Sequence, residues 1–200
     1  MIVVAFRRGF KTWCENTAKG FRRDLRMPIH SPLDPRALAK HLDVLIWTPE
    51  EVAKLGKLDD QHLEQLLVND PHSWSAVTLI MPHAKLIILN SQHAPTRQNS
   101  DIMHELSHLV LEHSPSRVDM TPKRLMILDT YDKVQEEEAN WLSGALLVPR
   151  DGLLSILSKN PCNVSASAHF DVSQQMLSWR RQVTGIDAQL RHRLPSVRAE

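Results

Sequence analysis

Residues 100–113 read SDIMHELSHLVLEH and contain the motif HExxH. The apolar side chains Ile102, Leu106 and Leu109 recur at the three-to-four spacing of an amphipathic helix. At about 100° per residue, His104 and His108 lie on one helix face within roughly 40° of each other, so both imidazoles can reach one ion. The stretch therefore predicts a helix that packs through its apolar stripe and presents two metal ligands on the other side.

Glu105 lies about 100° around this helix from His104, near such an ion without having to coordinate it. Its carboxylate could there accept a proton from a bound water. The chain has 11 histidines among 200 residues, and an HExxH match is expected by chance only roughly 0.03 times in such a chain. A helix with two exposed histidines and no metal is the alternative.

A catalytic zinc site needs a third protein ligand and one open position. The metzincin pattern would place glycine at 111 and histidine at 114, where this chain has Leu111 and Ser114. His113 would lie about 180° from His104 on a continued helix, so it does not replace the missing histidine. A carboxylate from the next predicted helix is the other option, with three adjacent candidates: Glu136, Glu137 and Glu138.

Asn140 follows Glu136 by four residues, so one helix face can present an acidic ligand and, beside it, an amide that orients a ligating imidazole. Ala139, Ser143 and Gly144 are small and would let two helices approach closely enough for ligand bonds of about 2 Å. The spacing leaves open which of the three carboxylates is the ligand. An ordinary solvated acidic face is the alternative for the triplet.

Around these two helices the pattern predicts a small sheet and further helices. Ala76–Met81 and Lys85–Asn90 are β-branched and apolar runs separated by Pro82-His83-Ala84, which indicates a hairpin, and Val44–Trp47 indicates a short strand. We expect polar loops at residues 92–100 and 114–123, with Ser100 and Asp101 capping the HExxH helix. The other helices are expected at residues 6–25, from 35, from 49, and at 59–68, 129–147, 151–158, 165–170 and 173–184, with Gly185 as a C-cap. The expected fold is α+β: a mainly helical, zincin-like domain with a small β-sheet built on the hairpin.

Composition excludes several classes of protein. The 42% hydrophobic and 24% charged fractions are those of a globular chain, and a net charge of +1 gives no strong field to attract nucleic acid or an anionic membrane. No run approaches the roughly 20 apolar residues of a membrane span, and no signal peptide is recognisable. Cys14 and Cys162 are far apart, which suits a reducing compartment. We expect a cytoplasmic protein without a membrane partner.

The length of 200 residues suits one domain with a single core. We expect residues 1–200 to form a single zincin-like metallopeptidase domain. Within it, residues 1–34 would be an N-terminal helix and linker, 35–150 the catalytic core and 151–200 a C-terminal helical subdomain.

The stretches HELSHLVLEH (104–113) and EEEANWLSGALLVP (136–149) resemble the ImmA/IrrE metallo-endopeptidases, whose pattern is HELxH, a loop, and then ExxANxFAxxLLMP. The similarity extends weakly to the end of the hairpin and to residues 170–173. Leu142, Ser143 and Val148 depart from the pattern at positions where the family has Phe, Ala and Met. These departures concern packing and leave the metal ligands unchanged.

This resemblance implies a zinc-dependent endopeptidase with His104 and His108 as zinc ligands, Glu105 as general base and Glu136 as third ligand. It also implies a protein substrate, a transcriptional repressor or antitoxin-like regulator encoded nearby, often on a mobile element or in a stress-response locus. The alternative is a zinc-containing regulator, sensor or toxin–antitoxin component that cleaves nothing.

DNA binding is a further alternative, because residues 166–181 resemble a helix-turn-helix whose second helix carries Arg180 and Arg181. A plain helix-loop-helix packing unit also explains this pattern, so we expect no nucleic-acid partner for the chain itself. For peptide hydrolysis, a second oxyanion donor is usual, and an extended substrate could pair with a free edge of the strand Lys85–Asn90. Four residues are unranked candidates for the donor: Tyr131, His83, His93 and His113.

Overall fold

The structure is a computed structural model, and it describes residues 6–54, 64, 74–113, 118–120, 126–128 and 132–193. Helices predominate and a small sheet accompanies them, which confirms the expected α+β class. The elements are, in chain order, α1 (Phe10–Asp24), α2 (Pro35–His41), β1 (Val44–Trp47), α3 (Pro49–Lys54), β2 (Ala76–Met81), β3 (Ala84–Leu89), α5 (Pro95–Val110), β4 (Val118–Met120), β5 (Met126–Leu128), α6 (Lys133–Leu147), α7 (Arg150–Lys159), α8 (Asn163–Phe170), α9 (Gln174–Thr184) and α10 (Ile186–Arg193).

The predicted hairpin is present as β2 and β3, which pair antiparallel with Ala76 opposite Leu89. β1 joins the other side of β3 in parallel register, Val44 opposite Lys85, so the strand order is β1-β3-β2. The expectation that the strand at residues 85–90 offers a free edge is therefore wrong, because both of its sides are paired. β1 and β2 are the two edge strands of this sheet, and β2 is the one that belongs to the hairpin. A separate two-stranded ribbon consists of β4 and β5.

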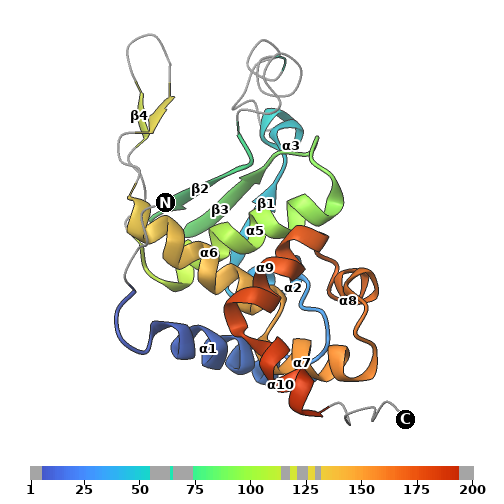
Figure 1. Ribbon diagram of the computed structural model, residues 1–200. Helices are drawn as coiled ribbons and strands as arrows, with labels where there is room; N and C mark the ends of the chain where they lie inside the picture. The colour runs from blue at the N-terminus through green and yellow to red at the C-terminus, as the bar shows by residue number, and fades with distance from the viewer. Residues whose placement is uncertain are drawn as a thin grey trace, which may run out of the picture.

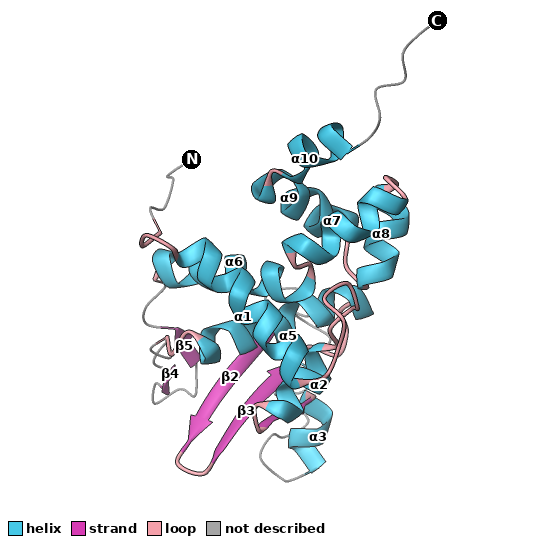
Figure 2. Ribbon diagram, turned by 90° about the horizontal axis from the view of Figure 1, so that it is seen from below, coloured by secondary structure: helices cyan, strands magenta, loops and turns pink. Residues whose placement is uncertain are grey.

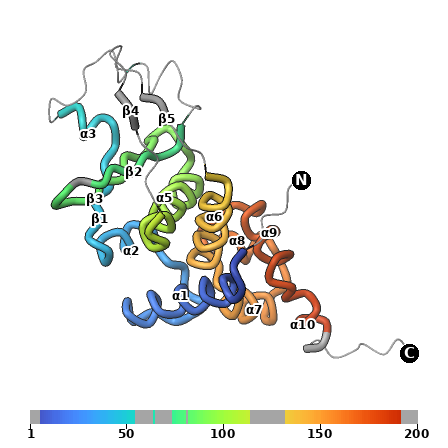
Figure 3. Tube along the Cα trace, turned by 90° about the vertical axis from the view of Figure 1, so that its left-hand side faces the viewer, coloured from blue at the N-terminus to red at the C-terminus, as the bar shows by residue number. Residues whose placement is uncertain are grey.

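The elements form layers around α5. The three-stranded sheet lies on one side of α5, and α6 runs alongside α5 on another side (Figure 1). α1 packs against α6, and α7 to α10 gather beyond α6, away from the sheet (Figures 2 and 3). Apolar side chains from the sheet, α1, α5, α6 and the C-terminal helices share one core. The helices α5 and α6 thus stand at the centre of the arrangement.

Two buried arginines hold the C-terminal end of α6. Arg22 of α1 donates to the carbonyl oxygen of Leu146 at 2.8 Å, and Arg180 of α9 donates to that of Val148 at 3.0 Å. Both arginine side chains are fully buried, and the carboxylate of Glu15 in α1 pairs with Arg180. Because the last carbonyls of a helix lack partners within it, these cations satisfy them and also oppose the negative end of the helix dipole.

The boundaries of α5 differ from the sequence prediction. α5 begins at Pro95 within residues expected to form a loop, because proline at the first helical position loses no hydrogen bond. Ser100 does not cap the helix, since its hydroxyl donates to the carbonyl oxygen of Thr96 at 3.1 Å inside α5. At its other end, α5 stops at Val110 rather than at His113.

Elsewhere, α10 follows Gly185 where no helix is expected, and β4 lies in a segment expected to be loop. Of the helix expected at residues 59–68, only residue 64 lies within the described part of the chain. Among the helices described, none combines the length and the apolar character that crossing a membrane requires.

Candidate metal centre

His104 and His108 lie one turn apart on α5, as predicted, and their imidazoles face each other. The Nε2 atoms are 3.0 Å apart, and the ring centroids are 4.7 Å apart at an interplanar angle of 68°. The buried side of α5 is formed by Ile102, Met103 and Leu106. The apolar stripe therefore fixes the rotation of the helix so that both histidines point toward α6.

Glu136 approaches this pair from the first turn of α6. Its Oε2 lies 3.2 Å from Nε2 of His104 and its Oε1 lies 3.4 Å from Nε2 of His108. Asp132 caps α6 by accepting from the backbone N–H of Val134 at 2.8 Å, which fixes where the helix starts and so where Glu136 points.

The three side chains have the spacing of a tetrahedral metal site. Each of His104, His108 and Glu136 offers one ligand atom, and these atoms lie within 4.8 Å of one another. Ligands at 2.0–2.1 Å from a tetrahedral zinc ion are about 3.3–3.4 Å apart, close to the three separations above. The donor set also fits, because two imidazoles and one carboxylate leave a fourth position open.

The other two acidic residues of the triplet point elsewhere. Glu138 faces His113, with its Oε2 3.3 Å from Nε2 of that histidine. Glu137 is exposed and lines a neighbouring pocket. Within the described residues, the geometry therefore brings only Glu136 of the three to the histidine pair.

Charges and burial shift the pKa values of these groups in different directions. Burial lowers the pKa of His108 to about 4, and the adjacent His104 adds to this shift. Burial also acts to lower the pKa of His104, but the hydrogen bond to Glu136 and the charges of the two glutamates outweigh it, and the net pKa is raised. The lowered pKa of His108 favours its neutral form, whose ring nitrogen has the lone pair that a metal ion needs.

Glu105 lies beside the cluster rather than in it. The hydroxyl of Thr78 in β2 donates to its Oε2 at 2.5 Å. Burial raises the pKa of Glu105, while the Thr78 hydrogen bond and His104 act against that shift. A raised pKa suits a carboxylate that must accept a proton and later return it. Nothing in the sequence singles out Thr78, because its role depends on the packing of the sheet against α5.

Asn140 occupies the place expected of it, next to the histidine pair. Its side chain interacts with His104 and helps to raise the pKa of that histidine. Gly144, by contrast, does not lie where the sequence suggests. The atoms nearest to a Cβ at Gly144 belong to Trp179 and Arg180 of α9, so this glycine makes room for α9 rather than for α5.

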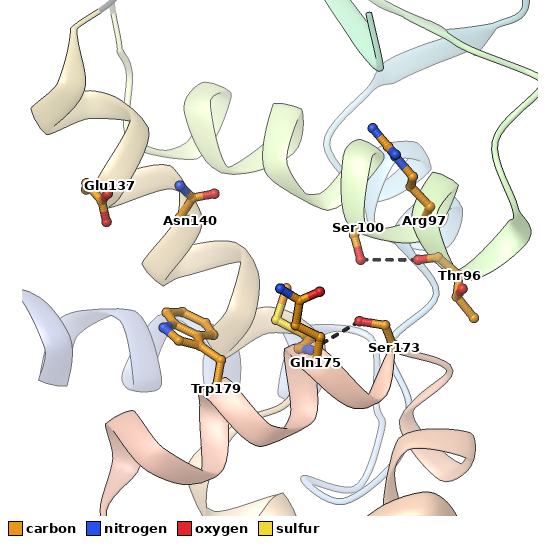
Figure 4. A pocket seen from close by; sticks show the side chains of 9 residues that line it. Thr96, Arg97, Ser100, Glu137, Asn140, Ser173, Gln175 and Trp179 are labelled. Carbon is orange, nitrogen blue, oxygen red and sulfur yellow. Dashed lines mark hydrogen bonds between the residues drawn. The ribbon is translucent and has the colours of Figure 1, made fainter. Parts of the chain in front are cut away.

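A pocket of about 520 Å³ adjoins the cluster on the side of α9. Figure 4 shows Asn140 reaching from α6 toward α5, with Gln175 and Trp179 of α9 below it, while Arg97 points away from Trp179. The lining residues come from three helices: Thr96, Arg97 and Ser100 of α5, Glu137 and Asn140 of α6, and Gln175, Met176 and Trp179 of α9, with Ser173 before it. Asn140, which also interacts with His104, is thus shared between the wall of the pocket and the surroundings of the cluster, although His104, His108 and Glu136 are not among the lining residues.

The candidates for a second oxyanion donor are scattered. His83 is exposed in the hairpin turn, and His93 is buried with its Nδ1 2.8 Å from Asp101. His113 contacts Nδ1 of His108, the ring nitrogen of His108 that faces away from Glu136. Tyr131 lies outside the described residues.

The family model of the IrrE N-terminal-like domain, Peptidase_M78, matches residues 60–180. The chain belongs to this family. The matched segment includes α5 and α6, which carry the histidine pair, Glu105 and Glu136. The comparisons with curated proteins and with solved structures returned no match. The Peptidase_M78 assignment and the His/His/Glu cluster together identify a protein of metallopeptidase type with a site compatible with a metal ion.

Proposed function

We propose that this protein is a zinc-dependent endopeptidase that hydrolyses a peptide bond of a protein substrate. The observation that carries the proposal is the cluster of His104, His108 and Glu136 with Glu105 beside it. In the proposed site the first three residues are the zinc ligands and Glu105 is the general base. Two imidazoles and one carboxylate with an open fourth position are a ligand set of catalytic zinc in peptidases.

A zinc ion held by these side chains supplies Lewis acidity, which lowers the pKa of a water toward about 7 and polarises a peptide carbonyl. Glu105 accepts a proton from the attacking water and later transfers it to the nitrogen of the leaving amine. The hydroxyl of Thr78 fixes Oε2 of Glu105. Oε1 has no hydrogen-bond partner among the described residues, so we assign the proton transfer to that oxygen.

The edge strand β2 supports binding of an extended chain. Among the strands that the structure describes, β2 pairs with β3 alone, and Thr78 of β2 touches Glu105. A substrate segment that adds to this edge would run past the general base, held by backbone hydrogen bonds. The pocket between α5, α6 and α9 would receive a substrate side chain next to the cluster.

We propose a transcriptional regulator encoded nearby as the substrate, on the strength of the sequence resemblance to the ImmA/IrrE peptidases. Such a substrate would place the reaction in the cytoplasm. The DNA-binding alternative loses its support, since Arg180 is buried against Glu15 and Arg181 pairs with Asp187 at 2.5 Å. Arg180 is thus withdrawn from the surface, and the charge of the partly exposed Arg181 is balanced by Asp187.

The test uses the purified full-length chain and the transcriptional regulator encoded beside its gene. We expect about one zinc per chain by elemental analysis, and cleavage of the regulator that a chelator stops. Glu105→Gln should keep the zinc and lose cleavage by about 10²- to 10⁴-fold, the usual contribution of a general base. Glu112→Gln, at an exposed acid just beyond α5, is the matched control and should cleave normally.

A second pair of variants tests the third ligand. Glu136→Ala should lower the zinc content far more than Glu137→Ala, because only the first removes a side chain of the cluster. Equal zinc loss from both variants would show that the wrong carboxylate has been assigned. Zinc binding without cleavage by the unmodified protein would favour the non-proteolytic regulator instead.

A further inference from the structure

A second histidine contact lies behind the metal cluster, on the side of His108 that faces away from Glu136. After α5 ends, Glu112 adopts a positive φ of 54°, and the chain turns back on the helix. The backbone N–H of His113 then donates to the carbonyl oxygen of His108 at 3.1 Å. This turn brings the two imidazoles together, with ring centroids 5.0 Å apart at 71°.

The side chains of α6, the turn and α5 form a continuous series of contacts. Oε2 of Glu138 lies 3.3 Å from Nε2 of His113, and Nδ1 of His113 lies 3.0 Å from Nδ1 of His108. Nε2 of His108 then faces Glu136 at 3.4 Å. The side chain of His113 is only 7% exposed, so water does not compete freely for these contacts.

One arrangement of protons satisfies the contacts from Glu138 through His113 to His108, and it leaves the contact between His108 and Glu136 to be bridged by the metal ion. A carboxylate only accepts, so Nε2–H of His113 donates to Glu138, and Nδ1 of that ring is the atom that accepts from His108. Nδ1–H of His108 donates to this atom, which leaves the lone pair of His108 on Nε2, facing Glu136. The opposite tautomer of His108 would direct an N–H into the cluster, where a metal ion needs a lone pair.

We propose that Glu138 and His113 are positioning residues that hold His108 in the tautomer and ring orientation needed to bind the metal ion. The inference rests on the proposed metal site and extends it to two residues outside the cluster. Carboxylate and carbonyl partners of ligating histidines act in this way in other metal sites, and their loss typically costs 10- to 100-fold in metal affinity. Here the carboxylate acts through an intervening imidazole.

The test measures zinc affinity by competition with a chromophoric chelator for the unmodified full-length protein and four variants. Glu138→Gln and His113→Phe should each weaken zinc binding by about 10- to 100-fold. Glu137→Gln is the matched control, because it removes a neighbouring charge that contacts neither histidine, and its affinity should stay within about two-fold of the unmodified protein. His113→Gln should recover part of the loss, since its amide oxygen can accept from Nδ1–H of His108.

A second readout separates positioning from general loss of structure. In a metal-free Glu136→Ala variant, where no carboxylate faces Nε2 of His108, ¹⁵N–¹H correlation spectra of the histidine side chains should show His108 protonated on Nδ1, and adding His113→Phe should shift it toward the Nε2-protonated form. Far-UV circular dichroism and urea unfolding of the metal-free variants should match the unmodified protein closely enough to exclude misfolding.

The possible failures are distinguishable. If the unmodified protein binds zinc but Glu138→Gln and His113→Phe bind it as tightly as Glu137→Gln, the positioning role is refuted and the metal site stands. If His108 is protonated on Nε2 in the metal-free Glu136→Ala variant, the assignment of protons is refuted. If the unmodified protein binds no zinc, the proposed function fails together with this inference.

Discussion

Replacing Gly144 by alanine tests how closely α6 and α9 pack beside the metal cluster. A Cβ at this position would lie 2.4 Å from Cζ3 of Trp179 and 2.9 Å from Cδ of Arg180. Carbon atoms in contact prefer about 3.5–4.0 Å, so the Trp179 ring must retreat by about 1 Å. The ring cannot do this freely, because it packs edge-on against Trp141 with centroids 5.8 Å apart.

Two opposing effects set the size of the change. Overpacking a filled core costs typically 1–3 kcal/mol, and we expect the upper end because both neighbours are restrained. Alanine is better than glycine within a helix by about 1 kcal/mol. Gly144→Ala should therefore lower the free energy of unfolding by about 2 kcal/mol, or the melting temperature by about 4–8 °C.

Gly20→Ala in α1 is the matched control. Its Cβ would meet only Nη2 of Arg23, at 4.0 Å, so the helix propensity acts alone and should stabilise the protein by about 0.5–1 kcal/mol. Urea unfolding followed by far-UV circular dichroism gives both values in the metal-free protein. If Gly144→Ala is as stable as Gly20→Ala, the close contact between α6 and α9 does not exist as described.

Three further predictions concern other contacts. Thr78→Val removes the hydrogen bond that lowers the pKa of Glu105, so this pKa should rise. The acid limb of the pH profile of kcat/KM should then move to higher pH, and an unchanged limb would show that Glu105 is not the group that titrates there. Glu15→Gln leaves the buried guanidinium of Arg180 without its counter-charge, and urea unfolding should show a loss of about 3 kcal/mol; a loss below that of a surface substitution would contradict this. Burial raises the pKa of the Cys14 thiol to about 12, so a thiol reagent at mildly alkaline pH should modify one cysteine in the folded chain and two in urea.

The sequence predicts the parts of the site that depend on local pattern. The faces of α5 and α6 follow from helical periodicity, and so does the approach of His104, His108 and an acid from the EEE triplet. The choice among the three acids follows only from the family resemblance, since helical spacing alone allows each of them. In the structure, Glu136 contacts His104 of α5, whereas Glu138 contacts His113 in the turn beyond α5.

Other parts depend on tertiary contacts that no local pattern carries. The helical wheel places His113 opposite His104, but the wheel does not apply beyond Val110, where α5 ends. No glycine marks the turn at Glu112, although its φ is 54°. The sequence therefore gives no signal that His113 would return to His108.

The sheet and the C-terminal helices show the same limit. β1 pairs in parallel with β3 across some forty intervening residues. The hairpin pattern contains no sign of this partner, so it predicts β3 as an edge strand. The arginines at 180–181 look suited to DNA, because a basic pair near a helix end gives no hint of a buried partner such as Glu15. The first turn of α5 is also missed, because its polar residues and its leading proline are typical of a loop as well.

The contacts of α1 have a consequence for synthesis of the protein on the ribosome. Arg22 reaches a carbonyl 124 residues ahead of it, and Glu15 pairs with an arginine 165 residues ahead. At translation rates of about 5–20 residues per second, the latter partner emerges roughly 10–30 s after Glu15. Until α6, the main packing partner of α1, is synthesised, Phe10, Cys14 and Ala18, all buried in the finished fold, lack that surface to cover them. The nascent chain thus exposes the apolar face of α1 until α6 is synthesised, which makes that face a natural binding site for a chaperone.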